Sequence, residues 1–218
     1  MMLSFSLRQH FVRAADHLKI SGTKCTECHD DLIKKKIVHP PAAAGCDTCH
    51  EYTEKGESAE VKLAAKGNEL CFICHSEMQE AMKGKKFTHP PIVDLGCVTC
   101  HSPHSTDHAP LLKVGITQLC LSCHRMPTGS QSSVSTGKVT IFPSTTIPGN
   151  YPNKAKKVLI DSSYMGHPYA NHPVSGVPEP KKKGKEMSCV SCHEAHFGNS
   201  VKMFKKDLVG QDLCVSCH

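Results

Sequence analysis

The chain has 218 residues, of which 39% are hydrophobic and 5% aromatic, and it contains no Trp. Because large aromatic side chains normally dominate core burial, these numbers argue against a conventional hydrophobic core as the main source of stability. The formal net charge is +6, and the 14 Cys and 16 His indicate that their chemistry organises the fold instead.

Every cysteine belongs to a Cys-x-x-Cys pair, and each pair is followed directly by a histidine. This is the attachment signature of c-type haem, in which two thiols add to the haem vinyl groups and the imidazole coordinates the iron. The sequence therefore predicts seven covalently attached haems c with seven proximal ligands. In chain order the motifs are motif 1 (Cys25, Cys28, His29), motif 2 (Cys46, Cys49, His50), motif 3 (Cys71, Cys74, His75), motif 4 (Cys97, Cys100, His101), motif 5 (Cys120, Cys123, His124), motif 6 (Cys189, Cys192, His193) and motif 7 (Cys214, Cys217, His218).

Two other interpretations of the cysteines explain less of the pattern. Structural zinc sites with four cysteines use the pairs in twos, so that seven pairs leave one over and the histidine has no role. A disulfide scaffold or a set of thioredoxin-like redox pairs also leaves the histidine unexplained.

The cofactors change the interpretation of the charge. Each oxidised haem with two ionised propionates lowers the net charge by one, which brings the +6 of the sequence to about −1, and to about −8 when all seven irons are reduced. We therefore expect no nucleic-acid partner. The lysine runs at 34–36, 83–86 and 181–185 fit solvated faces, or alternatively positions that neutralise propionates.

The order of motifs predicts one continuous haem-organised domain built from repeats. Each repeat contains a His-Pro, a first motif, a lysine-bearing linker and a second motif whose first cysteine follows a leucine, and the spacing between the two motifs is similar in all three repeats. The expected segments are an N-terminal segment with motif 1 (1–38), unit 1 (39–88), unit 2 (89–125), a haem-free insertion rich in Ser, Thr and Pro (126–165), and unit 3 (166–218).

The expected fold class is mostly irregular coil with short α-helices wrapped around a closely packed chain of haems. Long helices are disfavoured because 15 Gly and 14 Pro interrupt the chain, and little β-structure is expected beyond a possible short hairpin near 138–147. No apolar stretch has the length of a membrane span. The N-terminus is a poor signal peptide, since Arg8 interrupts its apolar run, and a leader upstream of this numbering is expected.

Nine histidines lie outside the motifs, and seven haems with two histidine ligands each need seven of them. His104 and His196 each follow a proximal histidine by three residues, and on a helix they would lie on the same side as that histidine. Since the two axial ligands of one iron lie on opposite faces of the haem, these two histidines are expected to reach a neighbouring haem. A proline after a histidine favours extended chain, from which an imidazole can be presented to an iron. The predicted distal ligands are His17, His39, His89, His104, His167, His172 and His196, while His10 and His108 remain open between ligand and exposed or propionate-bonded imidazole.

The repeats resemble the doubled Cys-x-x-Cys-His domain of multihaem c-type cytochromes, including cytochrome c3-like proteins and extracellular cytochrome filaments. The residues that carry the resemblance are His89-Pro-Pro, Gly96, motif 4, Pro103-His104, Leu111-Leu112 and Leu119 before motif 5. Unit 1 departs from the pattern, because Glu51-Tyr52-Thr53 follows His50 and no histidine stands at the position of His104.

The resemblance implies electron transfer along bis-histidine haems, and about 31 residues per motif leave little chain for a substrate pocket. We expect no enzyme, but a filament or conduit subunit in extracellular electron transfer, at the cell surface or outside the cell. The expected partners are other redox proteins, further copies in a homopolymer, and terminal acceptors such as metal oxides. The alternatives are a soluble periplasmic carrier, a multihaem reductase with an open iron position, and storage or sensing by haem.

Overall fold

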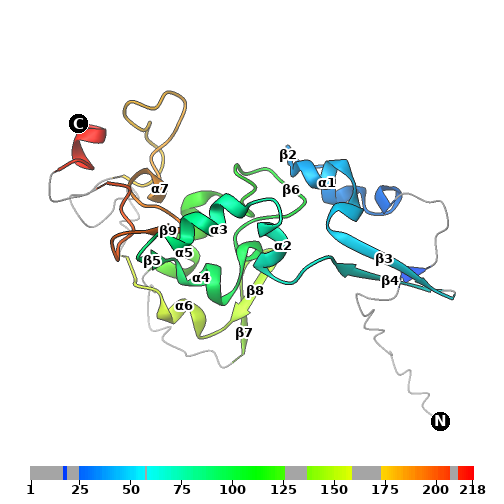
Figure 1. Cartoon of the computed structure of the whole chain (residues 1–218). Helices are drawn as coiled ribbons and strands as arrows, with labels where there is room; N and C mark the ends of the chain where they lie inside the picture. Colours follow the sequence, from blue (N-terminus) through cyan, green and yellow to red (C-terminus); the bar gives the residue numbers. More distant parts are fainter. Residues whose placement is uncertain (1–16, 19–24, 57, 126–136, 159–172, 207–210) are drawn as a thin grey trace, which may run out of the picture.

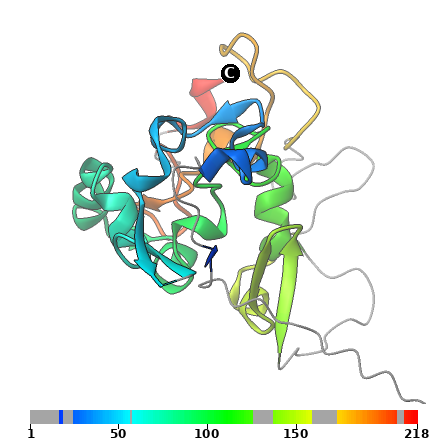
Figure 2. The same cartoon turned by 90° about the vertical axis from the view of Figure 1, so that its right-hand side faces the viewer.

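The structure is a computed structural model, and it describes residues 17–18, 25–56, 58–125, 137–158, 173–206 and 211–218. His10, His167 and His172 lie outside the described residues, as does much of the haem-free insertion. In Figure 1 the described chain runs from motif 1 at one end of the molecule, through the helices of units 1 and 2, to motif 7 at the other end, and Figure 2 views the molecule from the end that carries motif 1.

The helices are short. Most of them contain or directly follow a cysteine motif or a His-Pro segment, whereas α6 lies in the haem-free insertion. The longest, α5, has nine residues and contains motif 5. The α-helices are α1 (Pro40–Ala44), α2 (Asn68–Phe72), α3 (Ser76–Lys83), α4 (Pro90–Asp94), α5 (Ile116–His124), α6 (Tyr151–Lys154) and α7 (Cys189–Cys192). The 3-10 helices are η1 (Cys25–Glu27), η2 (Asp30–Ile33), η3 (Cys46–Thr48), η4 (Cys97–Thr99) and η5 (Cys214–Ser216). The expected coil with short helices is confirmed.

The strands form small antiparallel pairs. The hairpin β7 (Lys138–Phe142) and β8 (Thr145–Pro148) confirms the predicted hairpin near 138–147. The sequence did not predict the hairpin of β3 (His50–Lys55) and β4 (Ser58–Leu63). The other edge of β4 pairs with β1 (His17–Leu18). The remaining strands are β2 (Ile37–Val38), β5 (Phe87–Thr88), β6 (Ser105–Thr106) and β9 (Phe197–Gly198).

Two of the strand pairs link consecutive units in the same way. β2, directly before unit 1, pairs with β6 of unit 2, and β5, directly before unit 2, pairs with β9 of unit 3. The ladder continues through the adjacent histidines: the His39 N–H donates to the His104 carbonyl and the His89 N–H to the His196 carbonyl, both at 2.7 Å. Each unit is therefore joined to the next by a short strand pair that also brings two histidines together.

The His-Pro segments form these links because of local backbone restrictions. His39 and His89 have φ near −65° and ψ near 120°, the extended conformation that a following proline favours. Pro40 and Pro90 then begin α1 and α4, where a missing N–H costs no hydrogen bond. The histidine thus ends a strand and precedes a helix in both units.

The loops after motifs 4 and 6 repeat one another closely. In the first loop the Ser102 N–H donates to the Leu111 carbonyl, and in the second the Glu194 N–H donates to the Met203 carbonyl. The acceptors Leu111 and Met203 both have positive φ, at 60° and 54°. The two loops start from motifs that are 92 residues apart, and they are equivalent in backbone structure.

The hydrophobic core is sparse. No described side chain has a relative exposure below 2%. The Tyr151 hydroxyl, which is largely buried, donates to Asp94 Oδ2 at 2.9 Å and ties α6 to α4. The buried hydrophobic residues are Ala59, Leu112, Val114, Phe142, Ile147, Tyr151, Val174 and Met187. None of the helices in the described part of the chain has the length and hydrophobicity to cross a bilayer.

So few buried hydrophobic residues leave the haem-free polypeptide without enough apolar burial to offset its conformational entropy. We expect the chain made without haem attachment to lack a cooperative unfolding transition, whereas the mature protein shows one. Near-ultraviolet circular dichroism and amide hydrogen exchange of the two forms measure this. A haem-free chain with protected amides and cooperative unfolding would contradict the account.

Candidate haem-binding sites

Each cysteine motif forms about one helical turn. The N–H of the motif histidine donates to the carbonyl of the first cysteine in motifs 1, 3, 4, 6 and 7, at 2.9–3.1 Å. The same turn lies within α5 in motif 5. All 14 cysteines are free thiols, so the chain contains no disulfide. The cysteines remain available for thioether bonds.

Four imidazole pairs are the main feature of the sites. Each pairs a motif histidine with a histidine from another part of the chain, and the ring planes are near-parallel. The pairs are His39 and His75 (ring centres 6.3 Å apart, planes at 13°), His50 and His104 (6.3 Å, 17°), His89 and His124 (6.0 Å, 20°), and His101 and His196 (6.0 Å, 22°).

The spacing of the pairs fits an iron between the two rings. An imidazole nitrogen binds a first-row metal at about 2 Å and lies about 1.1 Å from its ring centre, so that two axial imidazoles have centres about 6 Å apart. The observed 6.0–6.3 Å agrees with this value. In the described residues no group of three or more His, Cys, Asp or Glu side chains is arranged to hold a metal ion directly. The imidazoles are therefore arranged as pairs.

Backbone carbonyls orient the paired rings. The Nδ1 atoms of His39, His101 and His124 lie 2.8–3.0 Å from the carbonyls of Pro103, Pro110 and Lys156. His193 Nδ1 lies 2.7 Å from the Lys202 carbonyl. A carbonyl only accepts, so Nδ1 carries the proton and Nε2 keeps the free lone pair that binds a metal.

Three segments of the chain match the family model described as the doubled CXXCH motif: residues 39–80, 89–127 and 179–218. Together they make up more than half of the sequence. The chain belongs to the doubled CXXCH family. The motifs of this family imply covalently bound haem c, and the family is consistent with a multihaem c-type cytochrome that transfers electrons. No curated protein matches the chain.

The structure places the two histidines that follow motifs 4 and 6 opposite another motif. His104 faces His50 and not His101, and His196 faces His101 and not His193. The expectation from sequence assumed a helix, whereas the residues after His101 form a bend leading into β6. The extended chain carries His104 away from motif 4 to the strand pair with unit 1.

The remaining histidines of this doubled CXXCH chain are only partly described. The His193 ring lies against the Phe204 ring, with centres 4.8 Å apart, and sequence reasoning did not identify this contact. His17 lies in β1, and its backbone pairs with Ala59 of β4. His108 supports the loop of motif 4, since its carbonyl accepts the Leu112 N–H at 2.8 Å. No described imidazole faces the His108 ring.

Burial favours the neutral form of four of the paired histidines. It lowers the pKa of His89, His101, His104 and His196, each of which is shifted mainly by the loss of solvent. The neighbouring imidazoles lower the pKa of His89 and His104 further. The neutral imidazole is the form that binds a metal.

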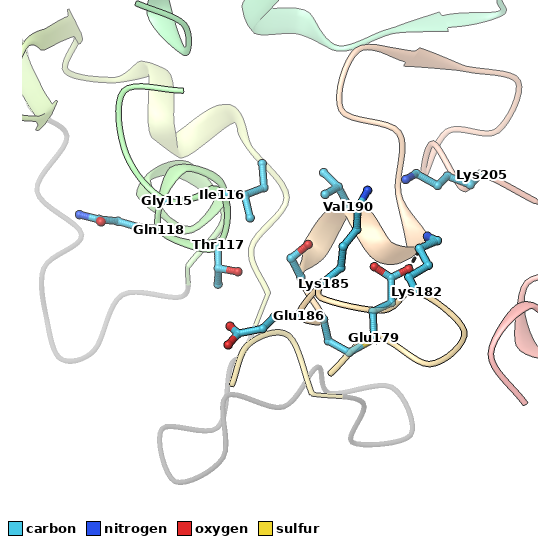
Figure 3. Close-up of a pocket in the computed structure, with 12 residues that line it drawn as sticks. Gly115, Ile116, Thr117, Gln118, Glu179, Lys182, Lys185, Glu186, Val190 and Lys205 are labelled. Carbon is cyan, nitrogen blue, oxygen red and sulfur yellow. Dashed lines mark hydrogen bonds and ion pairs between the residues drawn. The ribbon is translucent and has the colours of Figure 1, made fainter. Parts of the chain in front are cut away.

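An open hollow of about 500 Å³ lies between α5 and α7 (Figure 3). Lys182, Lys185 and Lys205 line it together with Glu179 and Glu186. Lys182 forms an ion pair with Glu179, and lysines of the other two runs form surface ion pairs, Lys34 with Asp30 and Lys83 with Glu80. Some lysines thus have carboxylate partners within the chain, as expected for solvated faces.

Glu179 is a buried carboxylate beside motif 6. It is 7% exposed, pairs with Lys182, and accepts a hydrogen bond from the Ser191 hydroxyl at 3.2 Å. The hydrogen bond from Lys182 is the main cause that lowers the pKa of Glu179. The ionised form therefore connects the lysine loop to α7.

Glu179→Gln is expected to lower the free energy of unfolding of the mature protein by about 1–3 kcal/mol at pH 7. A lowered folded-state pKa stabilises the protein above the unfolded value, and this contribution disappears as the pH falls through the folded-state pKa. The difference from wild type should therefore be constant above about pH 5 and shrink below about pH 4. Denaturant titrations at several pH values measure it, with Glu186→Gln, an exposed carboxylate of the same hollow, as control. An equal loss at pH 3 and pH 7 would contradict the ion pair.

Proposed function

We propose that the protein is a heptahaem c-type cytochrome that conducts electrons along a chain of bis-histidine haems. The observation that carries this proposal is the set of four near-parallel imidazole pairs at the spacing of two axial ligands. Bound haem supplies one-electron chemistry, and the chain supplies attachment, axial ligands and spacing. The two thiols and the histidine of each motif account for attachment and for the proximal side.

The proposed distal ligands follow from the pairs. His104 serves motif 2, His39 serves motif 3, His196 serves motif 4 and His89 serves motif 5. The rule behind them is regular. The His-Pro histidine of a unit serves the second motif of the same unit, and the histidine three residues after a first motif serves the first motif of the preceding unit.

Motifs 1, 6 and 7 complete the set of seven. His29, His193 and His218 are their proposed proximal ligands, and His17, His167 and His172 the proposed distal ones. The His-Pro rule assigns His172 to motif 7, since His172 precedes the first motif of unit 3 as His39 and His89 precede the first motifs of units 1 and 2. The Nδ1 hydrogen bond of His193 repeats that of His101, which supports the same role for both rings.

An electron carrier fits this arrangement better than an enzyme. Two axial imidazoles occupy both faces of an iron, whereas a catalytic metal keeps a position open for substrate. Carbonyl hydrogen bonds hold the rings in place, so that the ligands need not move when the iron changes charge. Bis-histidine ligation with partial solvent exposure favours low reduction potentials.

The proposed setting is extracellular electron transfer, as a filament or cell-surface conduit subunit. The support is the extended order of the molecule, in which motifs 1 and 7 lie at opposite ends (Figure 1). Sites at both ends allow electrons to enter from one partner and leave to another. The proposed partners are other redox proteins, further copies of the chain and terminal acceptors such as metal oxides. A periplasmic carrier is the alternative setting.

Electron microscopy of the purified mature protein over a range of concentrations tests the filament. The proposal expects filaments whose subunits repeat along one axis. Discrete particles at every concentration would contradict the filament and favour the periplasmic carrier, without affecting the electron-transfer proposal.

His104→Ala is expected to convert one haem from low-spin to high-spin, because motif 2 loses its distal ligand. The high-spin signal should persist when the haem of motif 4 is removed by Cys97→Ser with Cys100→Ser. It should disappear when the haem of motif 2 is removed by Cys46→Ser with Cys49→Ser. Electron paramagnetic resonance and the visible spectrum measure the spin state.

His108→Ala is the matched control, since it removes a histidine of the same loop that faces no described imidazole, and it should produce no high-spin haem. A His104→Ala signal that depended on motif 4 instead of motif 2 would contradict the pairing. His104→Met provides a second variant, which should keep the haem low-spin and raise its potential.

A further inference from the structure

Three pairs of consecutive motifs place a cysteine of one motif close to a cysteine of the other: Cys25 and Cys46, Cys71 and Cys97, and Cys120 and Cys189. For the first pair, the Leu32 carbonyl just after motif 1 accepts the Ser105 hydroxyl at 2.6 Å, beside His104, which faces motif 2. These contacts join motif 1 to 2, motif 3 to 4, and motif 5 to 6. Because each thiol becomes a thioether at the edge of its own haem, the proximity of two of them brings the edges of two haems together.

Hydrogen bonds and helix packing support two of these contacts between motifs. Between motifs 3 and 4, the Asn68 side chain in the first turn of α2 accepts the Cys97 N–H at 2.8 Å and donates to the Ile92 carbonyl at 2.7 Å. Between motifs 5 and 6, α5 packs against α7, and the Thr117 hydroxyl donates to the Val174 carbonyl at 2.9 Å. The cysteines are therefore held together by the helices that carry them.

The proposed distal histidines connect motif 2 to motif 3 and motif 4 to motif 5. His104 and His39 face motifs 2 and 3, and the hydrogen bond between their backbones keeps these two motifs adjacent. His196 and His89 face motifs 4 and 5 and are bonded in the same way. One strand pair thus presents two imidazoles to two different irons.

The loop that contains Glu179 and Lys181 connects motif 6 to motif 7. Glu179 accepts a hydrogen bond from the Ser191 hydroxyl within motif 6 at 3.2 Å. In addition, Lys181 Nζ donates to the Val215 carbonyl within motif 7 at 3.0 Å. The last two motifs are therefore neighbours as well.

From these contacts we infer that the seven haem sites lie in single file, in the order of their motifs along the chain. Figure 1 agrees with this order, because the colour changes from blue to red along the length of the molecule. The inference rests on the proposed function and adds the path to it. At each step a ferrous site becomes ferric and its neighbour becomes ferrous, so that an electron entering at motif 1 passes every site before motif 7.

Proton nuclear magnetic resonance of the fully reduced protein tests the order, since bis-histidine ferrous haems are diamagnetic. Nuclear Overhauser effects between haem substituents should link motifs 1 and 2, 2 and 3, and so on to 6 and 7. A link between two non-consecutive haems, such as those of motifs 2 and 4, would overturn the single file, as would the absence of a link between motifs 3 and 4.

Removal of single haems assigns the signals. Cys97→Ser with Cys100→Ser should abolish the links of motif 4 to motifs 3 and 5 and keep those among motifs 1–3 and among motifs 5–7. Cys214→Ser with Cys217→Ser, the matched control at the end of the file, should abolish only the link between motifs 6 and 7. The map of the unaltered protein stands if a variant fails to fold.

Failure of the inference differs from failure of the proposed function. Diamagnetic haems with an unexpected set of links would disprove the order alone. Paramagnetically shifted signals in the reduced protein would reveal open iron positions and disprove bis-histidine ligation itself.

Discussion

The two axial imidazoles of one iron approach it from opposite faces, and in the proposed bis-histidine arrangement this requirement governs how the three units pack. A motif supplies the first imidazole together with the cysteines, but its own helical turn cannot supply the second one on the other face. The second must come from elsewhere in the chain. In the four observed pairs the second imidazole comes from the start of the same unit or from the following unit. The strand pairs β2–β6 and β5–β9 position these histidines.

The same requirement explains the small core. A domain of ordinary composition buries aliphatic and aromatic side chains against one another, whereas this chain has few such contacts and no described side chain below 2% exposure. Val98, Ile73 and Val215 lie between the cysteines of their motifs and are exposed in the polypeptide. Such side chains stand next to the cysteines, where bound haem would supply the missing apolar surface. We therefore expect folding and haem attachment to be coupled.

Much of the site could be predicted from the sequence, because the patterns that indicate it involve residues close together in the chain. The motifs, the extended His39 and His89 before proline, and the exclusion of His104 from the haem of its own motif depend on neighbouring residues. The pairing of the imidazole rings could not be predicted from the sequence. His101 and His196, for example, are 95 positions apart, and the β5–β9 pair brings them together. The β3–β4 hairpin was missed although β4 alternates polar and apolar residues, because β3 contains only one apolar side chain, Tyr52, and begins within motif 2. It occupies the position where unit 1 lacks the additional histidine, and it pairs with β1, which contains His17.

The central claim is that the facing histidines are the two axial ligands of one iron. Electron paramagnetic resonance of the fully oxidised mature protein at low temperature tests this most directly, because the spectrum depends on the angle between the two imidazole planes. The four pairs have planes at 13–22°, and near-parallel planes give rhombic low-spin signals. The account predicts rhombic low-spin signals that integrate to at least four haems per chain. A spectrum dominated by high-spin ferric haem, or by the highly anisotropic signals of perpendicular imidazoles, would contradict it.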